Sequence, residues 1–395
     1  MKWEQKSLDE LGFVGRGKSK HRPRDAEHLY GGPYPFIQTG DVKHAALHVT
    51  SYSQTYSEAG LAQSKLWPSG TLCITIAANI AETAILGLEA CFPDSVIGFI
   101  ADERKCDARF IKYKFDTIKR QYQQVSQGAA QDNLSLEKLL AFKLNVPPPE
   151  AQRGIAAVLS AYDDLIENNR RRMALLEEAA RLLYREWFVR LRFPSHEHTP
   201  IIDGVPEGWK PLALGDICSE IRESVSPEAL DPDTPYIGLE HMPRRSIALN
   251  EWATVESVTS AKHRYKEGDI LFGKIRPYFH KVGMAFADGV ASSDAIVIRT
   301  ISNDLFSIVL MTVSSDEFVR EASQTMREGA KMPRADWKLM TKYPIALPPV
   351  GLLESFSGTV ICITDQLRNL SFQNQKLRAA RDLLLPRLMS GEIAV

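Results

Sequence analysis

Residues 147–187 have the sequence PPPEAQRGIAAVLSAYDDLIENNRRRMALLEEAARLLYREW, and residues 348–388 have the sequence PPVGLLESFSGTVICITDQLRNLSFQNQKLRAARDLLLPRL. Both segments open on consecutive prolines, three in the first and two in the second, and they start 201 positions apart (147 and 348). The same spacing relates Gly128-Ala129 to Gly329-Ala330 and Leu183 to Leu384. One spacing kept from residue 128 to residue 183 indicates an internal repeat, so the chain consists of two copies of one unit.

Seam residues at alternating spacings of three and four predict a long coiled-coil helix in each segment. The two seams are Leu159, Tyr162, Ile166, Asn169, Met173, Leu176 and Leu183 in the first copy, and Ile363, Leu367, Leu370, Asn374, Leu377 and Leu384 in the second. Two such seams in one chain predict that the helices pair with each other. The asparagine in each seam either fixes the register of that pair or lies at a frayed edge, and the sequence leaves both interpretations open.

The regions before the helices are typical of mixed α/β domains. Strands are expected at 71–76, 269–272 and 295–298, and an amphipathic helix with its charged side facing solvent is expected around residues 111–125. The predicted fold class is therefore α/β (α+β), with two tandem mixed α/β domains, each followed by a long helix. The predicted boundaries are 1–149 for the first domain, 150–192 for its helix, 193–208 for a linker, 209–349 for the second domain and 350–395 for the second helix and tail.

Composition excludes several classes of protein. The 48 Lys+Arg nearly balance the 49 Asp+Glu, so net charge gives no evidence for a polyanionic partner, although 104–120 and 262–281 are locally basic. The 5 cysteines form no C-x-x-C pair, which argues against a zinc cluster or a disulfide framework and favours reduced thiols in a cytoplasm. No apolar stretch is long enough for a bilayer span, and no leader is expected at the N-terminus.

Residues 12–19, GFVGRGKS, satisfy the phosphate-binding P-loop pattern, in which Lys18 and Ser19 would hold phosphates and magnesium. A P-loop needs a buried strand before it and a helix after it, whereas residues 4–11 are polar and Pro23 interrupts the expected helix. The sequence therefore favours a mobile, basic, glycine-rich segment suited to DNA phosphates, with a P-loop nucleotide hydrolase as the alternative function. The cations of this segment are Arg16, Lys18, Lys20, Arg22 and Arg24, within nine positions. No other catalytic motif is recognised.

Four sequence segments, taken together, resemble those of the specificity (S) subunit of type I restriction-modification systems. These pieces are GAAQDNL at 128–134 with VPPPEAQ at 146–152, VPEGW at 205–209, LLLPRLMSGEI at 383–393, and YPFIQTGDV at 34–42. The resemblance covers the whole chain. It implies two target recognition domains held apart by an antiparallel helix pair with pseudo-twofold symmetry. It further implies recognition of a bipartite, asymmetric DNA target, with one half-site per domain.

The resemblance also implies partners and a location. They are double-stranded DNA, two modification (M) subunits that methylate adenine with S-adenosylmethionine, and restriction (R) subunits that use ATP and Mg. The chain itself would hold no metal, no cofactor and no catalytic residue, and would act in the cytoplasm of a bacterium or archaeon, on the nucleoid. A coiled-coil adaptor without a DNA role stays open as a further alternative.

Candidate DNA-binding residues combine local charge, amide side chains and aromatics. In the first domain they are Arg16, Lys18, Lys20, Arg22, Gln38, Asp41, Gln131 and Asn133. In the second domain they are Lys274, Arg276, Tyr278, His280, Lys281, Lys331 and Arg334. The second copy departs from the first near 328–333 and has no counterpart of Gln152, so polar contacts are not expected to transfer one to one.

Overall fold

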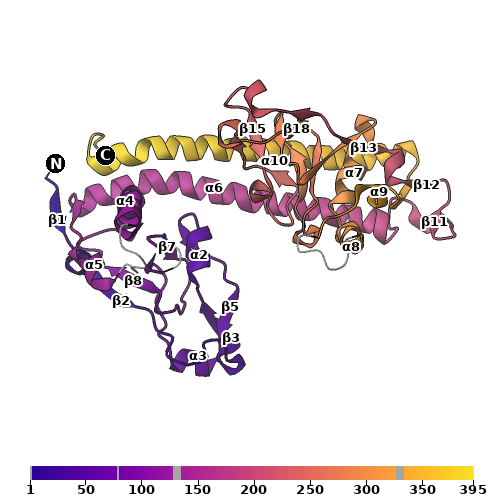
Figure 1. The fold of residues 1–395 in the computed structure, drawn as a ribbon. Helices are drawn as coiled ribbons and strands as arrows, with labels where there is room; N and C mark the ends of the chain where they lie inside the picture. Colours follow the sequence, from indigo (N-terminus) through magenta and orange to yellow (C-terminus); the bar gives the residue numbers. More distant parts are fainter. Residues whose placement is uncertain (1, 78–79, 128–134, 326–332) are drawn as a thin grey trace. The chain divides into compact units, whose positions relative to one another are not determined.

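The computed structural model describes residues 2–77, 80–127, 135–325 and 333–395 (Figure 1). The chain divides into two compact units, Met1–Asn168 with Gln375–Val395, and Asn169–Asn374. Each long helix contributes one part to each unit.

A five-stranded sheet forms the centre of the first unit, in the order β2-β8-β6-β7-β4. Its strands are β2 (Gly12–Arg16), β8 (Val96–Ala101), β6 (Leu72–Thr75), β7 (Thr83–Leu86) and β4 (His48–Val49). Neighbouring strands are antiparallel except β4 and β7, which are parallel. Strand β6 confirms the strand expected at 71–76, and its residues are buried on both faces of the sheet.

Smaller elements surround this sheet. They are β1 (Glu4–Lys6), α1 (Leu8–Leu11), β3 (Tyr30–Phe36), α2 (Thr39–His44), β5 (Gln54–Tyr56), α3 (Glu58–Ala62), α4 (Ala108–Gln127), α5 (Leu136–Ala141) and β9 (Leu144–Val146). Strand β1 pairs with β9, and β3 pairs with β5. Helix α4 covers β6 and β7 with buried Phe110, Ile111 and Phe115, which confirms the amphipathic helix. Its charged side is not wholly solvated as expected, because Lys112 is buried and its ammonium lies 2.7 Å from an Asp116 carboxylate oxygen.

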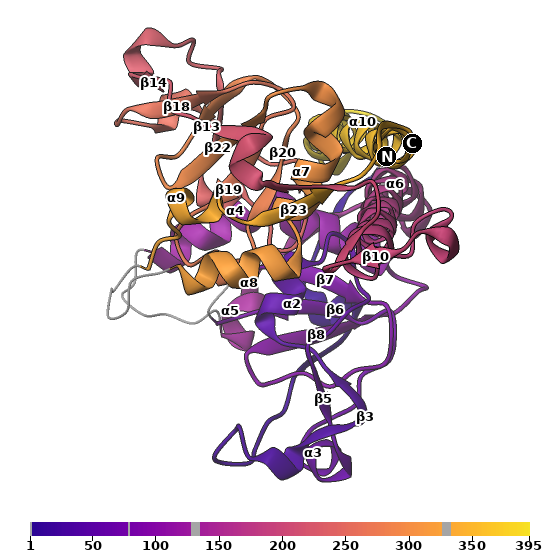
Figure 2. The same cartoon turned by 90° about the vertical axis from the view of Figure 1, so that its right-hand side faces the viewer.

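The second unit repeats the sheet of the first, in the order β13-β22-β19-β20-β16 (Figure 2). Its strands are β13 (Cys218–Ile221), β22 (Ala295–Thr300), β19 (Ile270–Gly273), β20 (Val282–Ala285) and β16 (Ala248–Leu249). Again all neighbours are antiparallel except one pair, here β16 and β20. The identical strand order and direction confirm the internal repeat, and β19 and β22 confirm the strands expected at 269–272 and 295–298.

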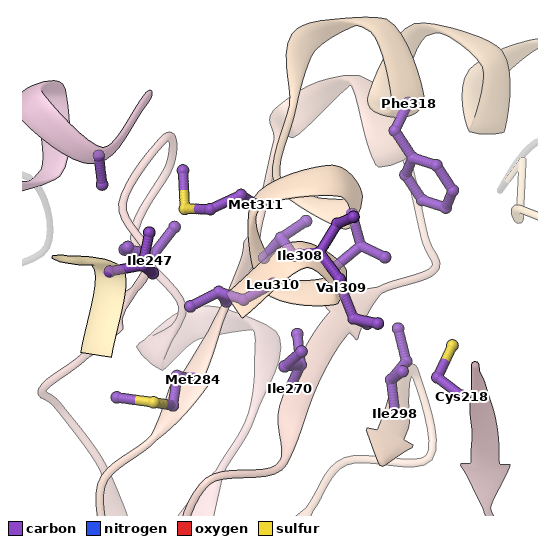
Figure 3. Close-up of a cluster of buried hydrophobic side chains, with 14 of the residues drawn as sticks. Cys218, Ile247, Ile270, Met284, Ile298, Ile308, Val309, Leu310, Met311 and Phe318 are labelled. Carbon is purple, nitrogen blue, oxygen red and sulfur yellow. The ribbon is translucent and has the colours of Figure 1, made fainter. Parts of the chain in front are cut away.

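The second unit adds a sheet that has no full counterpart in the first, in the order β14-β18-β21-β15-β17. Its strands are β14 (Ser224–Val225), β18 (Lys262–Tyr265), β21 (Gly289–Ala291), β15 (Pro235–Ile237) and β17 (Ala253–Thr254). The remaining elements are β10 (Ile201–Ile202), β11 (Val205–Pro206), β12 (Lys210–Ala213), α7 (Phe306–Val313), α8 (Asp316–Gln324), α9 (Trp337–Met340) and β23 (Pro344–Leu347). Helix α7 is buried on almost every side, and Figure 3 shows Ile308, Val309 and Leu310 above Ile270 and Ile298 of the sheet.

The long helices are α6 (Pro149–Tyr184), which continues as one π-helical turn to Val189, and α10 (Val350–Ser390). All of the predicted seam residues are buried or half-buried. In the first unit Arg381 forms an ion pair with Asp163. In the second unit Asn374 meets Asn169, and the Phe356 and Trp187 rings lie 5.8 Å apart. Residue numbers therefore rise along one helix as they fall along the other, and the predicted antiparallel pair is confirmed (Figure 1).

The seam asparagines contact each other directly. Asn169 Nδ2 donates to Asn374 Oδ1 over 3.0 Å, and both residues are almost fully buried. A buried amide without its partner would cost about 1–3 kcal/mol, so a shifted register is disfavoured. Of the two interpretations left open by the sequence, the structure supports the one in which the asparagines fix the register. Among the described residues, no helix is long and apolar enough to cross a membrane.

Candidate nucleic-acid interface

The P-loop-like segment is a strand and not a loop. Residues 12–16 form β2, which pairs along its length with β8, and the Gly17 amide continues the pairing by donating to Val96 O over 2.9 Å. A Cβ on Gly15 would lie 2.9 Å from the Trp67 ring, and one on Gly17 would lie 2.2 Å from a backbone oxygen. The two glycines therefore allow the backbone of this segment to pack closely against the Trp67 ring and against Phe92 and Pro93. The expectation of a mobile segment is wrong for Arg16 and Gly17, which continue the pairing with β8.

The same geometry removes the nucleotide-binding alternative. Ser19 is buried, with its hydroxyl 3.5 Å from the Tyr56 hydroxyl, and no helix begins directly after it. The Lys18 amide donates to Phe92 O over 3.1 Å and is not free for a phosphate. Without a loop of free amides and a helix N-terminus, Lys18 and Ser19 do not form a P-loop.

The segment that leaves β2 presents cations from an anchored backbone. The amides of Lys20 and His21 both donate to Gln63 Oε1, over 2.5 and 3.0 Å, and Ser64 Oγ donates to Lys18 O over 2.8 Å. The side chains of Lys18 and Lys20 are exposed. The segment thus holds its charged side chains at the surface, as an interface for a phosphate backbone requires.

A further cation, Lys65, extends this basic surface. The Lys65 ammonium lies 3.8 Å from the Trp67 ring centroid and 4.5 Å from that of exposed Phe13. Burial lowers the pKa of Lys65, and the nearby positive charge of Lys18 lowers it further. A polyanion placed here would relieve this repulsion.

Arg16 and Arg24, two other cations of this segment, are held by hydrogen bonds to Asp94. Arg16 Nε donates to the Asp94 carbonyl oxygen, and the Arg24 guanidinium forms two bonds of 3.0 Å to the Asp94 carboxylate. Arg22 is exposed and donates to the carbonyls of Ser19 and His21. Lys18, Lys20 and Arg22 therefore remain the most accessible of the predicted cations in the first domain.

The predicted polar residues Gln38 and Asp41 already have partners within the domain. The backbone amide of Gln38 donates to Asp41 Oδ2 over 2.7 Å at the start of α2, and the side-chain Nε2 of Gln38 donates to Gln54 Oε1 over 2.5 Å. These bonds hold α2 and β5 in place, and a DNA contact would have to share them. Gln131, Asn133 and Lys331 lie outside the described residues.

In the second domain the predicted residues cluster on the turn between β19 and β20. Its centre is a 3₁₀ turn, Pro277–Phe279, flanked by Arg276 at φ 48° and His280 at φ 53°. Left-handed backbone at a residue other than glycine costs on the order of 1–3 kcal/mol, and such strain concentrates at functional sites. The result is an outward tip with Arg276 exposed and the Tyr278 ring 53% exposed.

His280 and Lys281 anchor this turn. His280 is only 6% exposed, its Nε2 lies 2.8 Å from Ser314 O, and its Nδ1 lies 3.4 Å from Asp316. Burial lowers the pKa of the His280 imidazole, which favours the neutral ring. Lys281 Nζ donates to the Leu239 carbonyl. Sequence reasoning placed both at DNA, but the His280 ring has no free face to offer, so we remove His280 from the candidates.

A basic hollow of about 520 Å³ adjoins the turn. An isolated bridge between Ile275 and Arg334 brings Lys274 and Arg334, which sequence reasoning proposed separately, to the same hollow. Other lining residues were missed because they come from distant segments, and no local pattern marks them. They are Arg222, Trp337 and Lys338, with the acidic residues Glu220 and Asp336.

The aromatic part of the turn has a further cation that the sequence analysis missed. The Arg244 guanidinium lies 4.1 Å from the Phe279 ring centroid, a cation–π contact that stabilises the strained turn. The part of the chain that the structure describes contains no group of three His, Cys, Asp or Glu side chains able to hold a metal ion.

Comparisons with known proteins point the same way. A family model described as the type I restriction modification DNA specificity domain matches residues 1–178. The chain is 24% identical over 423 residues to the type I restriction enzyme MjaIX specificity subunit of Methanocaldococcus jannaschii, covering 100% of this chain and 94% of that subunit. It is 27% identical over 154 residues to the EcoDI specificity subunit of Escherichia coli, covering 38% of this chain and 33% of that one.

A solved structure shares the fold. The S subunit of a type I restriction-modification system from M. genitalium aligns with a TM-score of 0.62 at 14% identity, covering 98% of this chain and 96% of that one. The likeness therefore includes both mixed α/β units and both long helices.

Proposed function

We propose that this chain, which belongs to the family of type I restriction-modification specificity subunits, recognises a bipartite, asymmetric DNA target with one half-site per domain. The observation that carries the proposal is that both units contain a five-stranded sheet with the same strand order. The basic surfaces of the two units lie on different connections between the strands of these sheets. A repeated scaffold suits two similar half-sites on a duplex. Divergent surfaces suit two different base sequences.

The two surfaces differ in the DNA contacts that they support. In the first domain, lysines and an arginine extend from an anchored strand exit, as is typical of phosphate contacts. In the second, Arg276 and Tyr278 project from a strained turn beside a basic hollow, and arginine is the side chain that most often recognises guanine in the major groove. We therefore expect base recognition to be concentrated on this turn in the second domain.

Partners and cofactors follow from the family. Two methyltransferase subunits would assemble on this chain and methylate adenine with S-adenosylmethionine, and restriction subunits would use ATP and Mg for translocation and cleavage. This chain would supply recognition and no catalytic group. It would act in the cytoplasm of a bacterium or archaeon, on the nucleoid.

The decisive experiment is a methylation map of the host genome with and without this gene. Loss of one split adenine motif would establish the recognition role and give the target in one step. An unchanged map in cells that express the methyltransferase subunit would refute it. It would then leave the coiled-coil adaptor without a DNA role as the remaining candidate.

A further inference from the structure

Strand β2 carries a large apolar side chain at the surface of the first domain. Phe13 is 53% exposed, although its strand belongs to the main sheet. Its ring centroid lies 6.0 Å from that of Trp67, which is fully buried. Phe13 therefore rests on a buried ring and leaves about half of its own surface open to a partner.

The glycine two residues along the strand keeps the Phe13 ring in this position. A Cβ on Gly15 would lie 3.0 Å from the Phe13 ring and 2.9 Å from the Trp67 ring. Carbon atoms in contact normally lie about 3.5–4.0 Å apart, so a side chain at residue 15 would displace one of these rings. The local sequence thus holds an exposed ring in a defined place.

Lys65 contacts both of these rings. Its ammonium lies 3.8 Å from the Trp67 ring centroid and 4.5 Å from that of Phe13. Within the described part of the chain, this ammonium forms no ion pair and no hydrogen bond. Cation–π attraction to the two ring faces holds the charge in place without using its N–H groups. Lys65 therefore presents all of its hydrogen-bond donors from a fixed position.

The surroundings of this lysine are cationic. Ser64 Oγ donates to Lys18 O over 2.8 Å, which brings the basic segment beside Lys65. Burial lowers the pKa of Lys65, and the positive charge of Lys18 lowers it further. Lys18 and Lys20 are exposed and form no ion pair among the described residues. A ligand of this surface must therefore be anionic and must also offer an apolar group to Phe13.

Duplex DNA meets both requirements in its major groove. Its phosphates suit Lys18 and Lys20, guanine offers the acceptors O6 and N7, and thymine offers an apolar methyl group. Successive base pairs are about 3.4 Å apart, and the Lys65 ammonium lies 4.5 Å from the Phe13 ring centroid, so the two side chains can reach adjacent base pairs. An acidic protein segment would satisfy the same charges. Continuity with the segment already proposed to bind DNA phosphates favours DNA.

We propose that Lys65 and Phe13 recognise bases in the half-site of the first domain, Lys65 at a guanine edge and Phe13 at the methyl group of a thymine in the adjacent base pair. The inference rests on the proposed function and deepens it. Phosphate contacts from Lys18, Lys20 and Arg22 position a domain on DNA but carry no sequence information. Lys65 and Phe13 supply the base contacts that give the first domain a preference of its own.

The test uses the full chain assembled with its methyltransferase subunit, and duplexes that carry the split motif found by the methylation map. Single guanines are replaced with 7-deazaguanine, which lacks the N7 acceptor, and single thymines with deoxyuracil, which lacks the methyl group. We expect one guanine replacement in the first half-site to weaken binding about fivefold, as for one lost hydrogen bond. One adjacent thymine replacement should weaken it about fourfold, as for one methyl group that is no longer buried. Competition binding at one fixed salt concentration measures both costs.

Two variants assign these costs to the side chains. Lys65→Met keeps the length of the side chain and removes its charge, so it should abolish the cost of the guanine replacement and leave that of the thymine replacement. Phe13→Ala should do the reverse, because Lys65 keeps its contact with Trp67. The matched controls are Lys43→Met and Tyr52→Ala, which alter an exposed lysine and an exposed aromatic residue of the same domain outside this cluster. Both controls should leave the two costs unchanged.

Three results would overturn the inference. The first is a uniform loss of affinity over all duplexes in Lys65→Met with the guanine cost retained, which would make Lys65 a phosphate contact. The second is a change in the two variants that affects different half-sites. The third is the loss of methyltransferase subunits from the complex of Phe13→Ala without a change in base preference. Native mass spectrometry detects this loss, which would assign the ring to a protein partner.

The unaltered complex keeps the test decisive if a variant does not fold. If neither half-site contains adjacent guanine and thymine positions whose replacement weakens binding, the inference is overturned without any variant. The proposed function would still stand in that case, provided that the complex prefers the split motif to unrelated duplexes. A complex that binds both kinds of duplex equally would refute the proposed function itself.

Discussion

The two domains share a sheet and differ in where they carry positive charge. Residues 17–29, after β2, contain 4 Lys/Arg and 2 Asp/Glu, whereas residues 222–234, after the equivalent β13, contain one arginine and four acidic residues. The connection from β6 to β7 contains no Lys or Arg, whereas that from β19 to β20 has the sequence KIRPYFHK. The buried strands thus keep the same fold in both domains, whereas the connections between the strands differ and give each domain a different surface charge.

The domains also use the same device to attach to helix α6. In the first unit buried Asp163 accepts from Tyr113 Oη over 2.6 Å and pairs with Arg381. In the second unit buried Glu177 accepts from Ser246 Oγ over 2.6 Å and from the amides of Ile247 and Ala248. One carboxylate of the helix therefore holds each domain, although the partners differ.

The largest effect is expected from removing the carboxylate of the first unit. Asp163→Ala would leave the buried Tyr113 hydroxyl without its acceptor and would leave the half-buried Arg381 guanidinium with Asp382 as its remaining partner, so we expect a loss of about 3 kcal/mol in the free energy of unfolding. Denaturant titration of the full chain measures it. The neighbouring exposed Asp164→Ala is the control and should change stability by less than about 0.5 kcal/mol. Equal effects of the two variants would show that Asp163 does not hold the domain.

The next effect concerns recognition by the second domain. Arg276→Ala should weaken DNA binding by about 1–3 kcal/mol, because an arginine contact to a guanine edge or a phosphate is lost. Binding to targets altered in one half-site at a time tells the two contacts apart. Relaxed preference in the second half-site alone indicates a base contact, whereas uniform weakening with a shallower salt dependence indicates a phosphate contact. Changed preference in the first half-site would contradict the division of recognition between the domains.

A smaller effect is expected from the first domain. Lys18→Ala should weaken binding uniformly across DNA sequences and reduce the slope of affinity against salt by about one, as for the loss of one phosphate contact. Fluorescence anisotropy over a range of salt concentrations measures both quantities. Lys43→Ala, an exposed lysine of α2 outside the basic segment, is the control. A change in base preference would instead show that Lys18 reaches a base.

The smallest expected effect is a contribution of His280 to the pH dependence of the free energy of unfolding. Burial lowers the pKa of this imidazole from its usual 6.5, so the folded state binds the proton less readily than the unfolded state. Its contribution to stability is present above pH 6.5 and is lost as the pH falls below 6.5. The free energy of unfolding should therefore fall more steeply with acidification in the unaltered chain than in His280→Gln. Parallel pH profiles would show that the imidazole is not an anchor of the turn.

The sequence predicted the repeat, the helix seams and the main strands because these depend on periodic burial, which neighbouring residues reveal. It did not predict that Gly15 and Gly17 serve close packing, since the neighbours that require them, the Trp67 ring at Gly15 and the Phe92–Pro93 backbone at Gly17, lie more than fifty and seventy positions away. The charged and aromatic run at 274–281 was singled out from the sequence as a group of candidate DNA-binding residues, and the structure shows that this run forms the turn from β19 to β20. The split of that run into exposed Arg276 and buried His280 depends on the backbone φ angles and on helix α8, which a local pattern does not contain.

The first unit is completed by residues 375–395, and Leu388 and Met389 are buried in its core. During synthesis on the ribosome, residue 168 emerges long before residue 375, and at about 5–20 residues per second the delay is on the order of 10–40 s. Throughout that interval the first domain exposes the apolar side of α6 on which the end of α10 will later pack. The nascent chain therefore has an aggregation-prone surface whose lifetime is set by the translation of the second domain.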